Sequence, residues 1–499
     1  MKMKMSVAVV CCAAAGIVLA AANAPQIRVN GGSAERTEAG CWKITCPPGV
    51  KQVNVLFPAP ASDDAASAMI IDFYSPDLTR FFGFVQRIFA AKGAGFLRYS
   101  ISPLHSGEWI ALRFDRTLGT PVSGGVPDWG GLGMVKFTID VQNQEGGVVF
   151  LGDPRVERNV AVSPANPRER RLGWCIERAL SNRMNWDETA AFMKKYGFTD
   201  MIVLVSRAAA SFYDSKVMAK AVNWPDDCDN LRDGLAAARK YGLKYHAWRT
   251  DWQVRKETPR GLVKQFESEG RFQVAASGDI DKGWLCPSDP RNRKLEFDGY
   301  RELVDRGVDG IHFDYIRYKM EDYCFCPRCL NLFSKEMGES FTSAEAIRAN
   351  PAVLAKWYAF RAGLISSVVS NVAQYARAKG KEVSAALQRD APTDYVQKGQ
   401  DWVRWCKEGW LDFACPMDYY WSPDVYRGFV LRQREWLKGA KTKFYPGIGI
   451  AYNGCPTGMP AENVVEEVNF LREIEVDGFT VFSIGGGFAE KILPRVLGQ

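Results

Sequence analysis

The pattern of apolar and polar residues changes near residue 165. From about residue 26 to residue 157, short apolar runs alternate with Gly, Pro, Ser and Asp, which favour turns. Apolar runs of this length separated by turns are typical of a β-sandwich. We expect strands at 53–57, 68–74, 95–101, 109–114, 135–141 and 148–151, and either a helix or a strand at 80–92. The sandwich is predicted over residues 25–158, and a linker rich in Pro and Arg, 154–171, follows it.

Beyond the linker, apolar strand-like runs alternate with amphipathic helical segments. We expect strands at 172–177, 201–207, 245–252, 310–316, 383–388, 413–420, 444–452 and 478–484. We expect helices at 186–196, 229–241, 291–306, 352–379, 400–408, 424–439 and 461–475. Eight strands alternating with helices predict an α/β fold, a (β/α)8 TIM barrel over residues 168–499. A doubly wound open sheet is the alternative, although it does not require eight units.

The first residues predict an export signal. Lys2 and Lys4 precede an uncharged run over residues 6–22 that ends in small residues, as in a bacterial-type signal peptide. Pro25 would block cleavage after Ala24, so we expect a signal over residues 1–22 with cleavage after Ala22. A retained membrane anchor is the alternative. We therefore expect a secreted or periplasmic protein that has no membrane span once the signal is removed.

Charge and composition limit the chemistry. The 499 residues include 64 Lys and Arg against 57 Asp and Glu, and the net charge of +7 is spread along the chain. Such a small, dispersed excess argues against a nucleic-acid partner. The chain has only 3 His, all far apart, so a histidine-rich metal centre is excluded and acid–base chemistry falls to carboxylates. We expect no cofactor for catalysis.

The ends of the fourth and sixth expected strands each carry an aspartate. Catalytic residues of a TIM barrel lie at the C-terminal ends of its strands. In the fourth strand, the two-residue period places His312 and Asp314 on one face and apolar residues on the other. Asp314 then points into the barrel mouth, unless it is a structural carboxylate paired with Arg317.

The sixth expected strand follows the same period. Ala414 and Pro416 share a face with Asp418, while Phe413 and Cys415 would face the helices. Asp418 then also points into the mouth, with a loop-capping acid as the alternative. Two inward carboxylates with aromatic neighbours suit glycoside hydrolysis, in which one protonates the leaving oxygen and the other acts as nucleophile or base.

Other polar and aromatic residues near the strand ends are candidates for holding sugar hydroxyls or stacking on sugar rings. These substrate-binding candidates are His246, Trp248, Asp251, His312, Arg317, Tyr318, Gln388, Asp390, Tyr420, Trp421 and Tyr452. Each histidine is as readily an interior residue with satisfied hydrogen bonds. Asp251 and Asp390 are reserve acids should Asp418 have no catalytic role.

Three segments resemble the glycoside-hydrolase-like family 10. Residues 309–318 (DGIHFDYIRY) resemble its fourth-strand signature, residues 245–248 (YHAW) its third-strand motif and residues 412–420 its Pro-Met-x-Tyr strand. The resemblance runs from about residue 170 to the C-terminus and implies a TIM barrel in an exported enzyme acting on a polysaccharide or cell-wall glycan. Many relatives have two adjacent aspartates on strand four, whereas Tyr315 holds the second position here. A wider likeness to α-galactosidase-type barrels implies Asp314 as nucleophile and Asp418 as acid/base.

The cysteines predict a separate site. A C-x-C-x-x-C turn can direct three sulfurs at one zinc ion, and a closed structural site needs a fourth ligand. The spacing resembles the zinc cluster of some barrel β-galactosidases, in which an upstream cysteine joins the triple. The expected ligands of a structural zinc are Cys286, Cys324, Cys326 and Cys329. Disulfides and free thiols are the alternatives, and a disulfide between Cys41 and Cys46 fits an exported protein.

Two classes of function follow. The first is an exported glycoside hydrolase with a carbohydrate substrate and Asp314 and Asp418 as its working pair. The second is a non-catalytic carbohydrate-binding protein on a barrel scaffold, which the tyrosine at position 315 favours. The N-terminal sandwich either binds glycan or only covers the barrel.

Overall fold

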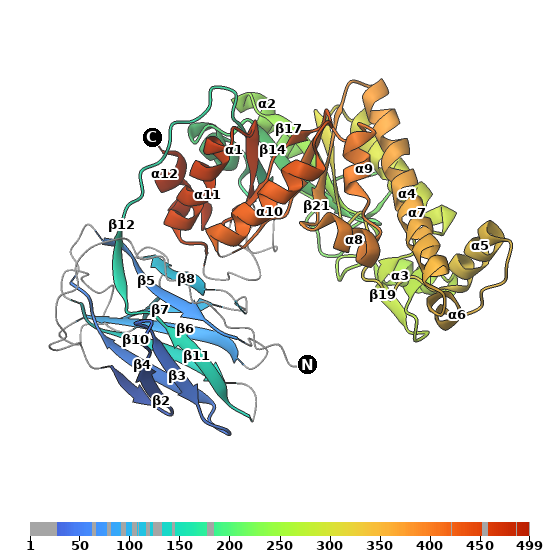
Figure 1. Cartoon of the computed structure of the whole chain (residues 1–499). Coiled ribbons are helices and arrows are strands. Elements are labelled where there is room, and N and C mark those ends of the chain that lie inside the picture. The colour runs from blue at the N-terminus through green and yellow to red at the C-terminus, as the bar shows by residue number, and fades with distance from the viewer. Residues whose placement is uncertain are drawn as a thin grey trace. The chain divides into compact units, whose positions relative to one another are not determined.

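The computed structural model describes two units of the chain (Figure 1). The described residues are 27–61, 66–76, 81–90, 96–101, 107, 109–115, 120–122, 132–141, 145–176, 184–420, 422–451, 458–485 and 487–498. One unit comprises Met1–Ala161 and Ala451–Glu466, and the other comprises Val162–Ile450 and Glu467–Gln499. The expected signal peptide lies outside the described residues.

The first unit contains two antiparallel sheets. The first sheet has the order β1 (Arg28–Asn30), β4 (Gln52–Pro58), β10 (Leu132–Val141), β6 (Phe81–Ala90), β7 (Phe96–Ile101) and β9 (Thr120–Val122). The second has the order β12 (Arg155–Arg158), β5 (Ala66–Tyr74), β11 (Gly147–Leu151), β3 (Trp42–Cys46) and β2 (Ser33–Arg36), with β8 (Trp109–Asp115) paired to β5. All six expected strands are present, and the undecided segment at 80–92 is the strand β6.

Apolar side chains of these two sheets are buried on alternate positions. In β4, Val53, Val55 and Phe57 are buried while their neighbours are partly or fully exposed. Phe73 of β5 lies 6.5 Å from Phe137 of β10, measured between ring centroids, so the two sheets meet at this point. Whether they form a complete sandwich stays a prediction.

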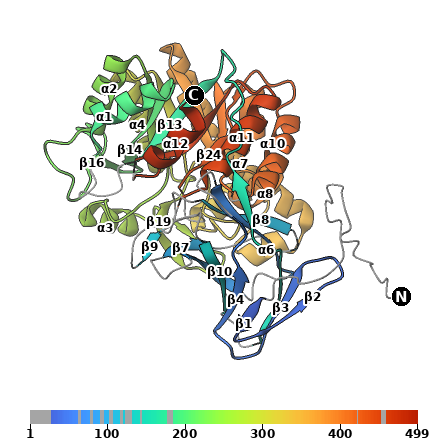
Figure 2. The same cartoon turned by 90° about the vertical axis from the view of Figure 1, so that its left-hand side faces the viewer.

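The second unit contains a curled sheet of parallel strands surrounded by helices (Figures 1 and 2). The order is β23 (Lys443–Phe444), β22 (Phe413–Pro416), β21 (Glu382–Leu387), β20 (Gly310–Asp314), β17 (Lys244–Thr250), β14 (Asp200–Arg207), β13 (Arg170–Cys175), β25 (Gly478–Ile484) and β24 (Gly447–Gly449). These strands lie at the eight expected positions, because β23 and β24 are two parts of the seventh.

The divided seventh strand connects the two ends of this sheet. β23 pairs with β22 and β24 pairs with β25, and only Tyr445 and Pro446 separate the two short strands. The main chain hydrogen-bonds to both neighbours there, from Tyr445 N to Ala414 O at 2.9 Å and from Thr480 N to Pro446 O at 3.0 Å. The sheet is therefore consistent with a TIM-like barrel.

The helices of this unit follow the expected pattern. The seven expected segments form α1 (Trp186–Lys195), α2 (Asn230–Tyr241), α4 (Pro290–Asp305), α7 (Pro351–Ala378), α9 (Trp402–Lys407), α10 (Pro423–Trp436) and α11 (Ala461–Glu473). Asp289 caps α4 by accepting a hydrogen bond from Arg291 N at 2.9 Å, with Pro290 in the first turn. Gly242 ends α2 with φ of 65°, a left-handed conformation that favours glycine.

Short elements in the loops were not expected. The helices are α3 (Arg260–Ser268), α5 (Pro327–Met337), α6 (Ala344–Arg348), α8 (Ala391–Lys398) and α12 (Ala489–Leu497). The strands are β15 (Ala210–Ser211), β16 (Ala219–Lys220) and the hairpin of β18 (Phe272–Val274) and β19 (Ile280–Leu285). The hairpin belongs to the connection between β17 and β20, the fourth strand.

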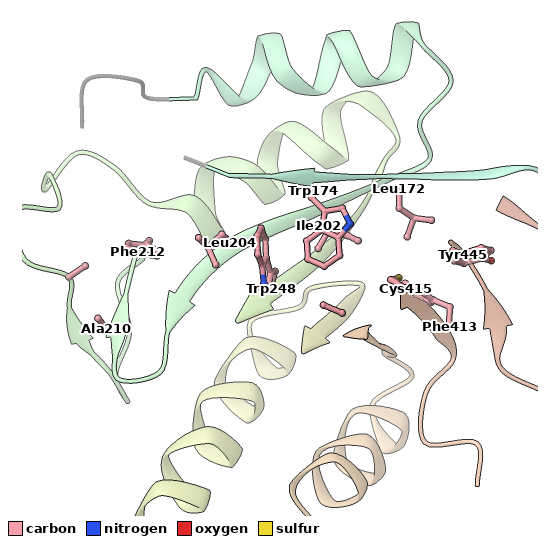
Figure 3. Close-up of a cluster of buried hydrophobic side chains, with 12 residues drawn as sticks. Leu172, Trp174, Ile202, Leu204, Ala210, Phe212, Trp248, Phe413, Cys415 and Tyr445 are labelled. Atoms are coloured by element: carbon pink, nitrogen blue, oxygen red, sulfur yellow. The ribbon is translucent and has the colours of Figure 1, made fainter. Parts of the chain in front are cut away.

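A cluster of buried apolar side chains fills the interior of the curled sheet (Figure 3). Trp174 and Trp248 meet edge to face at its centre, with ring centroids 4.8 Å apart. Phe413 and Cys415 of β22 belong to this cluster, so they point inward. The predicted facing of strand six was wrong by one residue, because both faces of this short strand are apolar and its two-residue period carries no polarity signal.

Among the described residues, one helix, α7, has a length and an apolar composition sufficient to cross a membrane. It packs against α4 and β21, and its buried residues include Trp357 and Arg361. These contacts are typical of a core helix in a barrel. The expected absence of a membrane span stays a prediction.

Candidate active site at the strand ends

Asp314 is the last residue of β20 and is 5% exposed. Its carboxylate accepts two hydrogen bonds, from Trp248 Nε1 to Oδ2 at 3.1 Å and from the main-chain N of Tyr315 to Oδ1 at 2.7 Å. Burial raises the pKa of Asp314 to about 6, although these bonds and the charges of Arg317 and Arg207 act in the opposite direction. A carboxyl group with this pKa exchanges protons near neutral pH, as acid–base catalysis requires. No ion pair within 4.0 Å joins Asp314 to Arg317 among the described residues, so the expected structural pair is absent.

A polar row crosses the C-terminal ends of three adjacent strands. Arg207 of β14 is in register with Thr250 of β17, which is in register with Asp314 of β20. Residues in register on parallel strands share a face of the sheet, and Asp314 faces inward beside Trp248. Ser206 and Arg249, which precede Arg207 and Thr250, face outward, because the Arg249 guanidinium bonds Ser206 and also Glu296 of helix α4. Arg207 and Asp314 therefore lie on the same inward face at the C-terminal ends of the strands, which we call the opening of the barrel.

Aromatic rings and a second arginine surround Asp314. The Arg317 guanidinium lies 4.8 Å from the Tyr315 ring and 5.2 Å from the Trp284 ring. Trp284 belongs to β19, which brings the unexpected hairpin to the site. On the other side, Tyr419 stacks on Phe482 with ring centroids 4.9 Å apart. Flat apolar faces beside a buried acid suit a sugar ring.

The carboxylate of Asp418 is bound to helix α10. Asp418 is fully buried, and its Oδ1 accepts a hydrogen bond at 2.7 Å from Gln433 Nε2 of α10. Asp418 lies two residues beyond the end of β22, and its catalytic role stays a prediction. Burial raises the pKa of Asp418 to about 7, so the side chain still titrates near neutral pH.

His246 lies near the opposite, N-terminal end of the strands. Its Nε2 is 2.9 Å from Asp200, at the start of β14, and its ring packs on Phe413. Arg170 joins the same cluster through bonds to Asp200 at 2.8 Å and to Glu382 at 2.7 Å. The structure therefore does not bring His246 to the strand ends that carry Asp314, and its substrate-binding role stays a prediction. The three groups Asp200, His246 and Glu382 lie close enough to ligate a metal, but the Arg170 guanidinium already supplies the positive charge.

Three further candidates are buried away from the opening. Asp251 is fully buried and accepts a hydrogen bond at 3.0 Å from Tyr300 of α4, and burial raises its pKa well above the ordinary value. Tyr318 is fully buried beneath the guanidinium of Arg361, 4.6 Å from its ring. His312 is fully buried below Asp314, with Nδ1 2.8 Å from Ser384 Oγ. Each of these side chains packs inside the protein, and their role in substrate binding stays a prediction.

The other candidates are half-buried or lie outside the described residues. Gln388 accepts a hydrogen bond from Lys398 at 2.8 Å, and Asp390 caps α8 by accepting one from Thr393 N at 3.2 Å. Tyr420 lies 5.8 Å from the Arg389 guanidinium. Trp421 and Tyr452 lie outside the described residues. Trp248 and Arg317 are thus the substrate-binding candidates that the structure brings to Asp314.

Several residues at the opening had not been singled out. They are Arg207, Glu257, Trp284 and Tyr419. Arg207 ends an expected strand, so the strand-end rule applied to strand two would have found it. Trp284 and Glu257 lie in the long connection between β17 and β20, where the alternation of apolar and polar residues does not predict the position of a side chain.

The four expected cysteines come together. Their sulfur atoms all lie within 4.8 Å of one another, with Cys286 Sγ 3.5 Å from Cys329 and 3.8 Å from Cys326. All four are buried and none forms a disulfide. Four convergent thiols fit the donor set of a tetrahedral structural zinc site. Cys41 and Cys46 are also free thiols, so the expected disulfide between them is absent.

Comparisons with known proteins agree with this geometry. Glycosyl hydrolase DigH of Escherichia coli O6:H1 is 24% identical over 258 residues, which are 46% of this chain and 55% of DigH. The chain thus matches just over half the length of this curated relative. The solved PgaB (BpsB) glycoside hydrolase domain of Bordetella bronchiseptica superposes with a TM-score of 0.53 at 14% identity, over 66% of this chain and 99% of that domain, which supports the fold.

The family itself is assigned from the sequence. The sequence model of the glycosyl hydrolase-like 10 family matches residues 174–452, which is more than half of the chain. The matched segment contains the strand end that carries Asp314 and the four clustered cysteines. The chain belongs to the glycosyl hydrolase-like 10 family.

Proposed function

We propose that this protein is an exported glycoside hydrolase that cleaves a polysaccharide or a cell-wall glycan, with Asp314 as the reacting carboxyl group. The observation that carries the proposal is a buried acid with a pKa near 6 at the strand end, among aromatic rings. Such an acid can exchange a proton with a glycosidic oxygen or attack the anomeric carbon. Trp248 holds the carboxylate through Oδ2 and so fixes its orientation.

Glycoside hydrolysis needs a second carboxyl group. Asp418 is the partner expected from the sequence, but its hydrogen bond to Gln433 turns it toward α10. Glu257 is a second candidate, because it interacts electrostatically with Arg207, which also interacts with Asp314. The Oε2 atom of Glu257 is buried and lacks a hydrogen-bond partner within the described parts of the chain.

The test is release of reducing ends from cell-wall glycan strands and from a panel of plant and algal polysaccharides. Asp314→Asn should lower kcat by about 10²- to 10⁴-fold, the usual contribution of an acid–base group. Asp305→Asn, on the exposed end of α4, is the matched control and should keep full activity. Undiminished turnover by Asp314→Asn would refute the assignment of Asp314.

A non-catalytic carbohydrate-binding protein is the second candidate function. It is favoured by Tyr315, which stands where many relatives have an acid, and by the buried position of Asp418. Retention on a glycan without release of any product, by the unmodified protein across the whole panel, would support it over hydrolysis.

Export rests on the N-terminal sequence. Lys2 and Lys4, followed by the uncharged run to Ala22, form the pattern of a secretory signal. An enzyme for cell-wall glycan or an external polysaccharide has to reach its substrate outside the cytoplasm, so the proposed localisation and substrate are consistent with each other.

We also propose that Cys286, Cys324, Cys326 and Cys329 hold a structural zinc ion. The arrangement closes a tetrahedral donor set and leaves no position for a substrate, so the ion would stabilise the fold and take no part in the reaction. The cluster links the end of β19 to the loop after β20, and Cys324 Sγ accepts a hydrogen bond from Val274 N of β18 at 3.2 Å.

The N-terminal unit is proposed to be a β-sandwich that assists carbohydrate binding. Tyr74, Trp109 and Phe150 lie side by side on β5, β8 and β11, with ring centroids of Tyr74 5.6 Å from Trp109 and 5.7 Å from Phe150. Trp109 is 39% exposed. A row of partly exposed rings can stack on successive sugars of a chain.

A further inference from the structure

Arg207 at the strand ends is a charged side chain without an ion-pair partner among the described residues. Its Nε atom is buried and has no hydrogen-bond acceptor there, and no described carboxylate lies within 4.0 Å of its guanidinium. Glu257, Arg255, Tyr315 and Asp314 are the charged or titratable groups that act on it. Glu257 is the strongest acidic influence but does not form an ion pair with it.

Two buried arginines of this unit, Arg249 and Arg361, also have an Nε atom without an acceptor among the described residues, but both are hydrogen-bonded through their Nη atoms. Arg170 pairs with Asp200 and Glu382, and Arg249 pairs with Glu296 at 2.6 Å. Arg361, which has no carboxylate partner in the described chain, donates to the main-chain oxygens of Val396, Met320 and Gln397. Arg207 is half-buried, and its buried Nε atom has no such partner among the described residues, which costs free energy. The lack of partners at Arg207 therefore points to an acceptor that arrives with a ligand.

Arg317 supplies a second cation at the same opening. Its Nη1 donates to two main-chain oxygens, of Tyr318 at 3.2 Å and of Lys319 at 3.5 Å. No carboxylate within 4.0 Å neutralises it in the described parts of the chain, and its charge acts on Asp314 as that of Arg207 does. Two guanidinium groups without an ion-pair partner among the described residues thus act on the carboxyl group of Asp314.

We propose that Arg207 and Arg317 form a subsite for an anionic group, a carboxylate or a sulfate, on the sugar that binds beside Asp314. The planar fork of an arginine binds either group through paired hydrogen bonds. The anion would neutralise guanidinium groups that the fold leaves uncompensated. The substrate class is therefore an acidic glycan, an inference that rests on the proposed function of the same site.

Binding is measured in the Asp314→Asn background, so that the result does not depend on turnover. Affinity electrophoresis at about 0.15 M salt compares neutral polysaccharides, uronic-acid polysaccharides with their carboxyl-reduced forms, and sulfated polysaccharides with their desulfated forms. The salt screens dispersed surface charge beyond about 8 Å. We expect either the uronic-acid polysaccharides or the sulfated polysaccharides to retard the protein, and the carboxyl-reduced or desulfated form of the same polysaccharide not to. Which of the two retards it identifies the anionic group as a carboxylate or a sulfate.

The variants assign the retardation to the arginines. Adding Arg207→Gln or Arg317→Gln should weaken binding of the acidic glycan by about tenfold or more and leave neutral glycans unaffected. Arg239→Gln removes the same charge at the exposed C-terminal end of α2 and should change nothing. Arg207→Gln should not lower Tm, because the guanidinium it removes is unpaired, whereas a purely structural arginine would give a lower Tm.

Three results would overturn the proposal. They are retardation by none of the acidic arms, equal retardation by acidic and neutralised forms, and unchanged binding by both arginine variants. Failure of hydrolysis by the unmodified protein would refute the proposed function alone, because the binding measurement stands without turnover.

Discussion

Opposing forces act on Asp314. Burial favours its neutral form, while two nearby arginines and two hydrogen bonds favour its charge, and burial prevails, with a pKa of about 6. An aspartate in an unfolded chain has a pKa near 3.9. Above about pH 6 the folded state therefore contains a buried carboxylate, which lowers the free energy of unfolding. The difference corresponds to roughly 3 kcal/mol of lost stability at pH 8, and the loss vanishes below about pH 4.

Asp314→Asn should therefore stabilise the protein while lowering kcat. We expect a gain of about 1–3 kcal/mol in the free energy of unfolding at pH 8 that shrinks toward zero at pH 4, because an amide carries no charge at either pH. Denaturant unfolding of both proteins at the two pH values measures it. Asp305→Asn on α4 serves as the exposed control, and a difference independent of pH would contradict the origin given for the pKa of Asp314.

The second acid can be identified by two substitutions. Glu257→Gln should lower kcat by about 10²-fold or more, because Glu257 acts on the arginine beside Asp314. Asp418→Asn should lower it by less, because its carboxylate is bound to Gln433. The pH profile of kcat/KM also distinguishes the two acids. If the change in kcat/KM near pH 7 disappears only in Asp418→Asn, then Asp418 is the second acid, as expected from the sequence.

The residues that sequence could place were those with an unambiguous face. Asp314 is the last residue of a strand whose alternate positions differ in polarity, and Trp248 lies in the neighbouring strand β17. Asp418 follows a strand that is apolar on both faces, so period alone could not orient it. His246 was assigned to the site because its strand was correct, but it lies near the wrong end of that strand.

At the scale of elements, the hairpin of β18 and β19 depends on the cysteine cluster. Its strands are 3 and 6 residues long, and a two-stranded hairpin of this size is marginal by itself. Cys286 at its end and the hydrogen bond from Val274 N to Cys324 Sγ attach it to the loop after β20. The hairpin carries Trp284, so the cluster also supports the aromatic wall beside Arg317.

Purified protein should contain about one zinc ion per chain, measured by elemental analysis. Cys286→Ala should remove it and lower Tm by about 5 °C or more, the shift that a loss of a few kcal/mol produces in a domain of this size. Cys406→Ala, a buried cysteine outside the cluster, should keep the metal. Absence of zinc from protein purified under reducing conditions would eliminate the metal and leave four free thiols.

Strands and helices of the barrel were predicted more completely than its loops. All eight strand positions and seven helices were predicted from the spacing of apolar residues, which recur every two residues in strands and about every 3.6 residues in helices. The hairpin, α5 and α8 were missed because short elements in long connections are set by tertiary contacts, such as those of Cys324 with Val274. Since the long connection between β17 and β20 supplies Trp284 and Glu257, these residues of the site could not be predicted from the periodicity of the sequence.

At the scale of the whole molecule, the chain should be processed on export. Expressed with its own N-terminus in a bacterium, the mature protein should begin at Asn23, the residue after the expected cleavage site, as measured by mass spectrometry of the N-terminal peptide. Activity in the periplasmic or culture fraction is expected together with it. An intact N-terminus on protein in the membrane fraction would favour the retained anchor instead.

The aromatic row of the N-terminal unit makes a separate prediction for the full chain. Trp109→Ala should reduce retention on insoluble glycan several-fold, because a sugar stacked on an aromatic ring is held by apolar contact, while kcat on a short soluble substrate stays unchanged. Trp109→Tyr should restore much of the retention. Equal retention by all three proteins would assign this unit a covering role only.

The cluster of Arg170, Asp200, His246 and Glu382 has a consequence for life outside the cell. Burial raises the pKa of Asp200, but bonds from Arg170 and His246 outweigh it and hold that pKa well below its ordinary value. A carboxylate shifted in this direction contributes its full stability above about pH 4 and loses it only as pH falls toward the lowered pKa. Arg170, at the first residue of the barrel, thus stays tied to its second and fifth strands in acidic surroundings, which the proposed export would bring the protein into.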